Sequence, residues 1–129
     1  MTPPVRYIDC DALVDLLRTS GGQVAVIDVR DEDWVGGHVA GAVNWPSSNF
    51  EHNDSIDELI ATVLQGKDKA VVHCMFSQQR GPRSALKLAQ RLEEVNRQNV
   101  AVLVLRGGFQ RFRAMYGSDA SLFADVVRC

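Results

Sequence analysis

The stretch AVVHCMFSQQRGPRSA, residues 70–85, joins a short apolar run to a helix-forming segment through a loop that begins with a cysteine. The run 70–73 is β-branched and nearly all apolar, which is typical of a strand buried on both faces. Pro82 suits the first turn of a helix, because its fixed φ and its missing N–H are tolerated there. We therefore predict a buried strand, a compact loop over residues 74–80 and a helix that continues to about Val95.

Two further apolar runs, residues 24–29 and 100–105, also lack alternation and are predicted to be buried strands. Helical patterns lie between the runs. Asp9 is placed to cap a first helix, and a capping box at residues 55–58 is predicted to open a second helix that reaches about Gln65. Strands that alternate with helices need crossover connections, so we expect an α/β fold with a mostly parallel sheet covered on both faces.

Length and composition favour a single domain over residues 1–129, because 46% of the 129 residues are hydrophobic and suffice for a core. The formal net charge of −2 gives no indication of a nucleic-acid partner or of binding to an anionic membrane. The first residues lack the apolar core of a signal peptide, and no later stretch is long enough to span a membrane. We therefore expect a cytoplasmic protein.

The three cysteines, Cys10, Cys74 and Cys129, are too few and too scattered for a disulfide framework. Reduced thiols are the expected state. Histidines and carboxylates show no metal-ligand spacing, so we predict no metal site, no nucleotide site and no bound cofactor. Cys10 and Cys129 are either bystanders or resolving thiols, and we favour the first interpretation.

Cys74 stands where the strand should give way to the helix, and Arg80 follows six positions later. The backbone N–H groups of such a loop converge on an anion at the helix N-terminus, and the same field favours a thiolate. Arg80 adds a planar cationic fork that can hold two oxygens of a tetrahedral oxyanion. Together they form a minimal site for attack on phosphorus, or on arsenic or antimony in an equivalent oxyanion. The competing interpretation is a small buried cysteine beside an ordinary surface arginine.

The neighbours of this loop leave alternatives open. His73 either hydrogen-bonds to loop carbonyls or supports the thiolate electrostatically. Ser77 either donates to the thiolate or leaving group, or serves a local turn. Arg83 begins a basic stripe with Lys87 and Arg91, which is interpreted as a solvated helix face. Arg83 is close enough to the loop to be a candidate binder of an arriving anion.

The loop at residues 74–83 resembles the active-site loop of the rhodanese-fold cell-division-cycle dual-specificity phosphatases and of the related eukaryotic arsenate reductases. Residues 26–30 and 37–44 resemble the rhodanese signature D-x-R followed by G-H-I-x-G-A-x-N, and residues 106–109 resemble its late Gly-Gly-aromatic element. The matches run in the family's order over residues 24–112. The resemblance implies a rhodanese-like α/β domain with a central, mostly parallel sheet of about five strands and helices on both faces.

Within this group the length of the chain, close to that of a bare domain, is most similar to the arsenate/antimonate reductases, and the resemblance suggests the protozoan type. The resemblance implies that Cys74 attacks the pentavalent oxyanion, which Arg80 stabilises. Glutathione would then attack the adduct as a co-substrate, and glutaredoxin would complete the reduction to the trivalent form. The residues whose backbone amides would bind the oxyanion are Met75, Phe76, Ser77, Gln78, Gln79 and Arg80.

The resemblance also implies structural roles outside the loop. Asp28 and Arg30 would form an ion pair that stabilises loops, and His38 would serve as a structural hydrogen-bonding residue. The phosphatase loop carries acidic residues where this chain has Met75 and Gln79, so an acid to protonate an ester's leaving group is missing from the loop. Asp28, at the end of a strand, is the other candidate for that acid.

Two alternatives to the reductase therefore stay open. One is a protein tyrosine or dual-specificity phosphatase that uses the same C-x5-R loop for a phosphate ester, as its main or second activity. The other is a non-catalytic rhodanese-like binding module with an inert cysteine. An ordinary sulfurtransferase is disfavoured, because its loop is one residue shorter and sized for sulfane sulfur. Both a monomer and a homodimer are compatible with the sequence.

Overall fold

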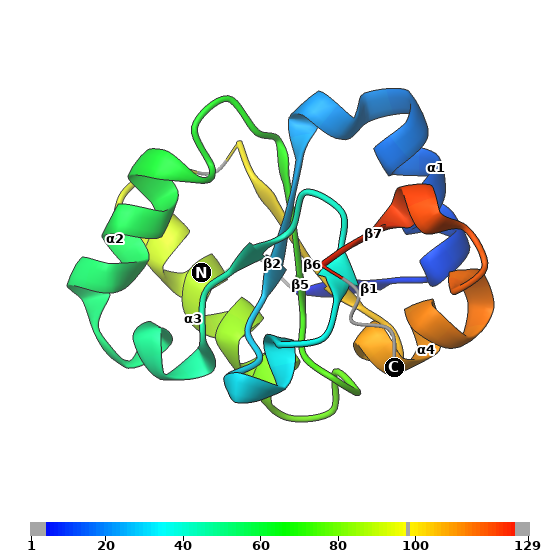
Figure 1. The fold of residues 1–129 in the computed structure, drawn as a ribbon. Coiled ribbons are helices and arrows are strands. Elements are labelled where there is room, and N and C mark those ends of the chain that lie inside the picture. Colours follow the sequence, from blue (N-terminus) through cyan, green and yellow to red (C-terminus); the bar gives the residue numbers. More distant parts are fainter. Residues whose placement is uncertain (1–4, 98, 126–129) are drawn as a thin grey trace.

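A five-stranded parallel sheet forms the centre of the protein, which was analysed as a computed structural model that describes residues 5–97 and 99–125 (Figure 1). Its strand order is β1-β6-β5-β2-β4, and every neighbouring pair is parallel. The strands are β1 (Arg6–Ile8), β2 (Val24–Asp28), β4 (Val43–Asn44), β5 (Lys69–His73) and β6 (Ala101–Leu105). A separate antiparallel pair joins β3 (His38–Val39) to β7 (Phe123–Ala124).

Helices cover both faces of the sheet. Figure 1 shows α2 (Asn53–Thr62) and α3 (Arg80–Glu94) on one side, and α1 (Cys10–Ser20) and α4 (Gly108–Tyr116) on the other. Short 3-10 turns span Gly21–Gln23, Glu32–Trp34, Ser47–Glu51 and Ala120–Leu122. The predicted fold class, a rhodanese-like α/β domain with a parallel sheet between helices, is confirmed in its architecture.

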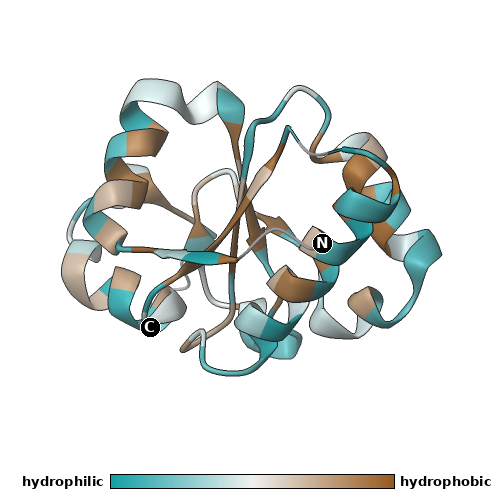
Figure 2. Ribbon diagram, turned by 180° about the vertical axis from the view of Figure 1, so that it is seen from behind, coloured by the Kyte–Doolittle hydropathy of each residue, from teal (hydrophilic) through white to brown (hydrophobic). Residues whose placement is uncertain are grey.

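The inner strands of the sheet are apolar at successive positions. Because successive side chains point to opposite sides, both faces of the sheet are apolar. Ala25 and Ile27 of β2 belong to the hydrophobic cluster beneath α2 and α3, whereas Val24 and Val26 belong to the cluster beneath α1 and α4. In Figure 2 the central strands are accordingly brown, and the outer faces of the helices carry most of the teal. This double burial explains why the sequence runs of these strands do not alternate.

Several element boundaries differ from the sequence prediction. The second helix begins at Asn53, so the box at residues 55–58 lies inside its first turns and does not cap it. Asp9 does precede α1, but its side chain makes no capping hydrogen bond and instead accepts one from Arg106. Helix α3 begins at Arg80, one residue earlier than a loop over 74–80 allows, and Pro82 lies in its first turn as predicted.

The register of the strands brings three chain segments to one edge of the sheet. Asp28 at the end of β2 lies opposite His73 at the end of β5, and β6 ends nearby at Leu105. Because the strands are parallel, the segments that come after them all emerge at the carboxyl edge, where ligands bind in open α/β sheets. Cys74 is the first residue after β5.

Candidate active site

The loop after β5 is hydrogen-bonded to the beginning of α4. The backbone N–H of Phe109 donates to the carbonyl oxygen of Cys74 (3.0 Å), and that of Gln110 donates to the carbonyl oxygen of Met75 (2.9 Å). Gly108 makes this approach possible, because a Cβ atom there would lie only 2.5 Å from the Met75 carbonyl oxygen and its φ is +63°. The first two carbonyls of the loop are therefore committed to α4.

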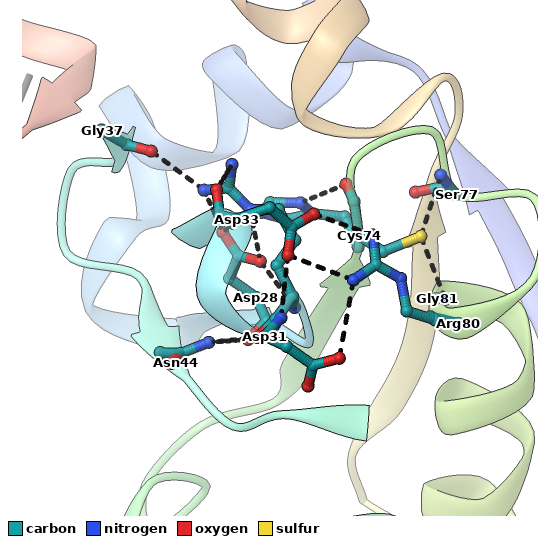
Figure 3. A network of polar contacts seen from close by, with 11 residues as sticks. Asp28, Asp31, Asp33, Gly37, Asn44, Cys74, Ser77, Arg80 and Gly81 are labelled. Atoms are coloured by element: carbon teal, nitrogen blue, oxygen red, sulfur yellow. Dashed lines mark hydrogen bonds and ion pairs between the residues drawn. The ribbon is translucent and has the colours of Figure 1, made fainter. Parts of the chain in front are cut away.

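The sulfur of Cys74 accepts two backbone hydrogen bonds. The N–H of Ser77 lies 3.2 Å from Sγ, and the N–H of Gly81, in the first turn of α3, lies 3.3 Å from it (Figure 3). Ser77 adopts a left-handed conformation with φ +54°, which is how the loop turns back onto the sulfur. Two N–H donors at the N-terminus of a helix therefore face a sulfur that is almost completely buried.

Arg80 lies at the mouth of this loop but faces a carboxylate. Its guanidinium donates to both oxygens of Asp33 (3.2 and 2.9 Å), and Nη1 also lies 3.9 Å from Asp31 (Figure 3). The hydrogen bond from Arg80 holds the pKa of Asp33 below its usual range, and Asp33 raises the pKa of Arg80 in turn. Sequence reasoning placed Arg80 beside the anion and missed Asp33. The acidic run 31–33 directly after the D-x-R element was the available signal.

Asp28 and Arg30 form the expected ion pair, and both side chains are completely buried. The guanidinium of Arg30 also donates to the carbonyl oxygens of Asp33 and Gly37, each at 2.9 Å. The amide of Asn44 donates to the carbonyls of both Asp28 and Arg30. Arg30 therefore fixes the loop that carries Asp33. Because Asp28 is buried and bonded to Arg30 through both oxygens, its surroundings do not suit an acid that meets a substrate.

The imidazole ring of His73 contacts the backbone of the cysteine loop. Nδ1 lies 3.1 Å from the carbonyl oxygen of Cys74, and a carbonyl only accepts, so Nδ1 carries the proton and donates. Complete burial lowers the pKa of His73. Its other nitrogen lies 3.9 Å from Asp28. These contacts favour the structural one of the two interpretations of this residue.

The mouth of the loop is a small cavity of about 290 Å³, lined by Cys74, Phe76, Gln78, Gln79 and Arg80. Of the predicted oxyanion-binding residues, Met75 and Ser77 do not line this cavity, and Met75 lines a different one. The contribution of Ser77 to the sulfur is its backbone N–H. Its buried hydroxyl has no hydrogen-bond partner among the residues that the structure describes.

The family model of the rhodanese-like domain matches residues 10–115 of the chain. The chain belongs to the rhodanese-like family. The family resemblance seen in the sequence is thereby confirmed, and the D-x-R aspartate, the cysteine loop and the Gly-Gly-aromatic element of this rhodanese-like domain all meet at one edge of the sheet.

Two curated relatives carry different activities in their names. The chain is 35% identical over 109 residues to the CDC25-like phosphatase YCH1 of Saccharomyces cerevisiae, covering 79% of this chain and 74% of the yeast protein. It is 34% identical over 112 residues to arsenate reductase 2.2 of Oryza sativa subsp. japonica, covering 84% and 82%. Among solved structures, the As-Sb reductase from Leishmania major superposes with a TM-score of 0.86 at 33% identity, covering 93% of this chain and 85% of that one.

The basic stripe on α3 of this rhodanese-like domain is largely ion-paired. Lys87 lies 2.9 Å from Glu51, and Arg91 makes two hydrogen bonds to Asp57 at 2.7 and 2.8 Å. Arg83 reaches Glu51 only at 3.9 Å and remains mostly exposed. Of the three cations, Arg83 is therefore the one whose charge is least neutralised near the loop.

The remaining predicted features lie outside the cysteine loop of residues 74–80. Cys10 is buried at the start of α1, where burial raises the pKa of its thiol, and Cys129 lies outside the described residues. His38 stacks on Trp34 with ring centroids 3.7 Å apart. Across residues 5–97 and 99–125 there is no group of three or more histidine, cysteine or acidic side chains arranged to hold a metal ion. No described helix combines the length and the apolar character needed to cross a membrane.

Proposed function

We propose that this protein is a thiol-dependent reductase of arsenate and antimonate, in which Cys74 attacks the pentavalent oxyanion. The observation that carries the proposal is the Cys74 sulfur, which accepts hydrogen bonds from the N–H groups of Ser77 and Gly81 at the N-terminus of α3. A tetrahedral oxyanion bonded to that sulfur would meet the same positive end of the helix. Arg80, at the mouth, is the cation that would neutralise the anion.

The relatives support oxyanion chemistry at a thiol. One relative is named an arsenate reductase, one solved structure is of an As-Sb reductase, and another relative is named a phosphatase. Arsenate, antimonate and phosphate are all pentavalent oxyanions whose oxygens accept hydrogen bonds from amides and guanidinium groups. We infer that the three activities draw on one kind of anion site and differ in the chemical steps after the first attack.

The proposed reaction balances as two displacements and one reduction. The thiol of Cys74 displaces one oxygen of arsenate as water and forms a sulfur–arsenic bond. Glutathione displaces a second oxygen as water and forms a second sulfur–arsenic bond. A thiol of glutaredoxin then attacks the glutathione sulfur, a disulfide forms, and the electron pair of the broken bond reduces arsenic from the pentavalent to the trivalent state. Water finally releases arsenite and regenerates the Cys74 thiol.

This scheme needs no bound cofactor, because its two electrons come from glutathione and glutaredoxin. Such thiols are kept reduced in the cytosol, so a cytoplasmic location follows from the proposal. The site also suits the reductase better than the phosphatase. An alkoxide leaving group needs a separate acid, whereas a hydroxyl group of arsenate can leave as water with the proton of the attacking thiol. The mouth carries Gln78 and Gln79, and its nearest carboxylate, Asp33, is held ionised by Arg80.

The second candidate function is a phosphatase acting through the same loop, which the yeast relative favours. Both activities can be measured on one preparation. Arsenate reduction is followed as NADPH consumption in the presence of glutathione, glutaredoxin and glutathione reductase, and phosphatase activity as release of an aryl alcohol from its phosphate ester. Antimonate replaces arsenate in a parallel assay.

The matched variants are Cys74→Ser and Cys10→Ala. We expect Cys74→Ser to lose arsenate reduction by at least about 1000-fold, because an alcohol is a far weaker nucleophile toward arsenic, while Cys10→Ala changes it less than about threefold. Efficient Cys74-dependent phosphate release without arsenate reduction would overturn the reductase in favour of the phosphatase. Loss of neither activity in Cys74→Ser would overturn the site itself.

A further inference from the structure

A second and larger cavity lies beside the cysteine loop. Its volume is about 740 Å³, compared with about 290 Å³ for the mouth around Cys74. Its walls come from the loop after β2, from the start of the cysteine loop and from α4 with the segment after it. The side chains that matter here are those of Asp33, Val35, Met75, Phe109, Arg113 and Phe123. A space of this size is typical of sites for small organic molecules and far exceeds what one oxyanion needs.

Two residues that line this cavity connect it to the mouth around Cys74. Met75, which lines the cavity, is the residue directly after Cys74. Asp33, which also lines it, is hydrogen-bonded through both oxygens to Arg80, and Arg80 lines the mouth. A molecule in the larger cavity would therefore lie near the mouth where an adduct on Cys74 would form.

The charges along the walls of the cavity are not all available to a ligand. Arg30 has its guanidinium committed to Asp28 and to two backbone carbonyls. Arg113 is different. Its guanidinium lies 5.4 Å from the ring centroid of Phe109, and it makes no ion pair with any residue in the described part of the chain. Asp33 contributes the acidic side of the same cavity, and Phe109, Phe123 and Met75 contribute apolar walls.

We propose that this cavity binds glutathione, and that Arg113 holds one of its carboxylates. This inference rests on the proposed reductase function. Glutathione is a small peptide with two carboxylates, one ammonium group and a thiol, so one of its carboxylates complements the free guanidinium and its apolar atoms complement the apolar walls of the cavity. Bound there, its thiol attacks the arsenic that is bonded to Cys74. One oxygen of arsenic leaves as water with the thiol proton, and a second sulfur–arsenic bond forms.

Kinetics with two thiols test the assignment. The rate of arsenate reduction is measured against glutathione and, separately, against dithiothreitol, which has no carboxylate for Arg113 to hold. We expect Arg113→Glu to raise the KM for glutathione about tenfold or more, because it replaces a charge-assisted hydrogen bond with repulsion. The KM for arsenate should change much less, and the glutathione rate should fall far more than the dithiothreitol rate. Arg113→Lys should recover much of the glutathione affinity.

The matched control is Arg111→Ala, which removes an exposed arginine of the same helix that does not line the cavity. It should leave the KM for glutathione unchanged. An equal loss with both thiols in Arg113→Glu, or an unchanged KM for glutathione, would overturn the assignment.

Direct binding separates this inference from the proposed function. S-methylglutathione, which cannot react, is titrated into the full chain carrying Cys74→Ser, and amide chemical shifts are followed by NMR. We expect shifts at Met75, Phe109 and Arg113 that are absent in the double variant with Arg113→Glu. If the wild type reduces arsenate with neither glutathione nor dithiothreitol but these shifts appear, the reductase function fails and the binding site stands. If arsenate is reduced but the shifts appear elsewhere or not at all, the site assignment fails and the function stands.

Discussion

Cys10 and Cys74 are buried to nearly the same extent, 2% and 3% exposed, yet their sulfurs face opposite kinds of group. The thiol of Cys10 points at the carbonyl oxygen of Arg106, 3.9 Å away, and this oxygen accepts a hydrogen bond from the protonated thiol. The sulfur of Cys74 faces two N–H donors. Two cysteines of equal burial thus differ in the polarity of the groups that face their sulfurs, and we expect this difference to separate their reactivity.

The difference arises from where each cysteine stands in the fold. Cys10 opens α1 and belongs to the apolar cluster beneath α1 and α4, where desolvation raises the pKa of its thiol. Cys74 stands between β5 and α3, in a loop whose carbonyls are bound by α4. The first setting needs only a cysteine at a buried position. The second setting also requires a helix N-terminus and the close approach of another chain segment.

Gly108→Ala removes the difference between the two cysteines by displacing the whole cysteine loop. The new Cβ would lie 2.5 Å from the Met75 carbonyl oxygen at a backbone φ of +63°, so the cysteine loop must shift. A misplacement of about 1 Å in a reacting group costs on the order of 100-fold in rate, and we expect arsenate reduction to fall by that much. The alkylation rate of Cys74 by iodoacetamide should fall toward that of Cys10.

The control for Gly108→Ala is Gly66→Ala. Gly66 has a similar φ of +77°, but its Cβ would meet nothing within 4 Å. It should cost about 1–2 kcal/mol of folding free energy from backbone strain alone and leave the reactivity of Cys74 as it is. Equal effects of the two substitutions on Cys74 would mean that the contact between α4 and the loop does not shape the site.

Arg80→Ala separates stabilisation of the bound anion from the reactivity of the Cys74 sulfur. Removing one preorganised charge that faces a developing oxyanion costs about 100- to 1000-fold in rate, so kcat/KM for arsenate should fall by that amount. Neutral iodoacetamide does not need the guanidinium, and its rate with Cys74 should change less than about threefold. Arg18→Ala, which removes an exposed arginine of α1 that is paired with Asp119, is the control and should have little effect on either rate. A matching collapse of the alkylation rate in Arg80→Ala would show that Arg80 acts on the sulfur and not on the anion.

Asp33→Asn tests whether the carboxylate at the mouth competes with the anion. The Asp33–Arg80 pair is about one-third exposed, so its loss is worth about 0.2–1 kcal/mol. The arsenate concentration that halves the alkylation rate of Cys74, measured without glutathione, should fall about two- to fivefold. Asp57→Asn breaks the comparable pair with Arg91 on α3 and should not change this concentration. Weaker protection by arsenate in Asp33→Asn would contradict competition and assign Asp33 to positioning Arg80.

His73→Asn has the smallest expected effect, on the pH dependence of stability. Burial lowers the pKa of His73, so between its ordinary pKa of about 6.5 and the lower folded value the unfolded chain binds more protons than the native one. The free energy of unfolding should therefore decrease as the pH falls below about 6.5. In the variant, whose amide still can donate to the Cys74 carbonyl, this decrease should be smaller. Identical pH slopes for both proteins in denaturant titrations would contradict the assignment.

The sequence was sufficient to predict the elements that carry their own local signal. The central strands β2, β5 and β6 are long apolar runs, and α3 has both Pro82 at its start and an apolar stripe. The position of Cys74 followed from these elements. By contrast, β3 and β4 have two residues each, and such short strands exist only because a neighbour pairs with them.

Long-range contacts account for what the sequence did not predict at the site. Asp33 and Arg80 are 47 positions apart, and nothing in either segment identifies the other. The turning of Arg80 toward Asp33 follows from Arg30, which fixes the intervening loop through two backbone carbonyls. The second helix was predicted to begin at the capping box of residues 55–58. The 3-10 turn Ser47–Glu51 comes just before it, and α2 begins at Asn53.

The most direct test of the account is the rate at which each cysteine of the native protein is alkylated at neutral pH, resolved by mass spectrometry, with and without arsenate. If Cys74 is the nucleophile of an oxyanion site, it reacts much faster than Cys10, and arsenate protects it while Cys10 stays unmodified. If the two cysteines react at similar rates, or if arsenate gives Cys74 no protection, the groups that face the sulfur do not make it the nucleophile of an oxyanion enzyme.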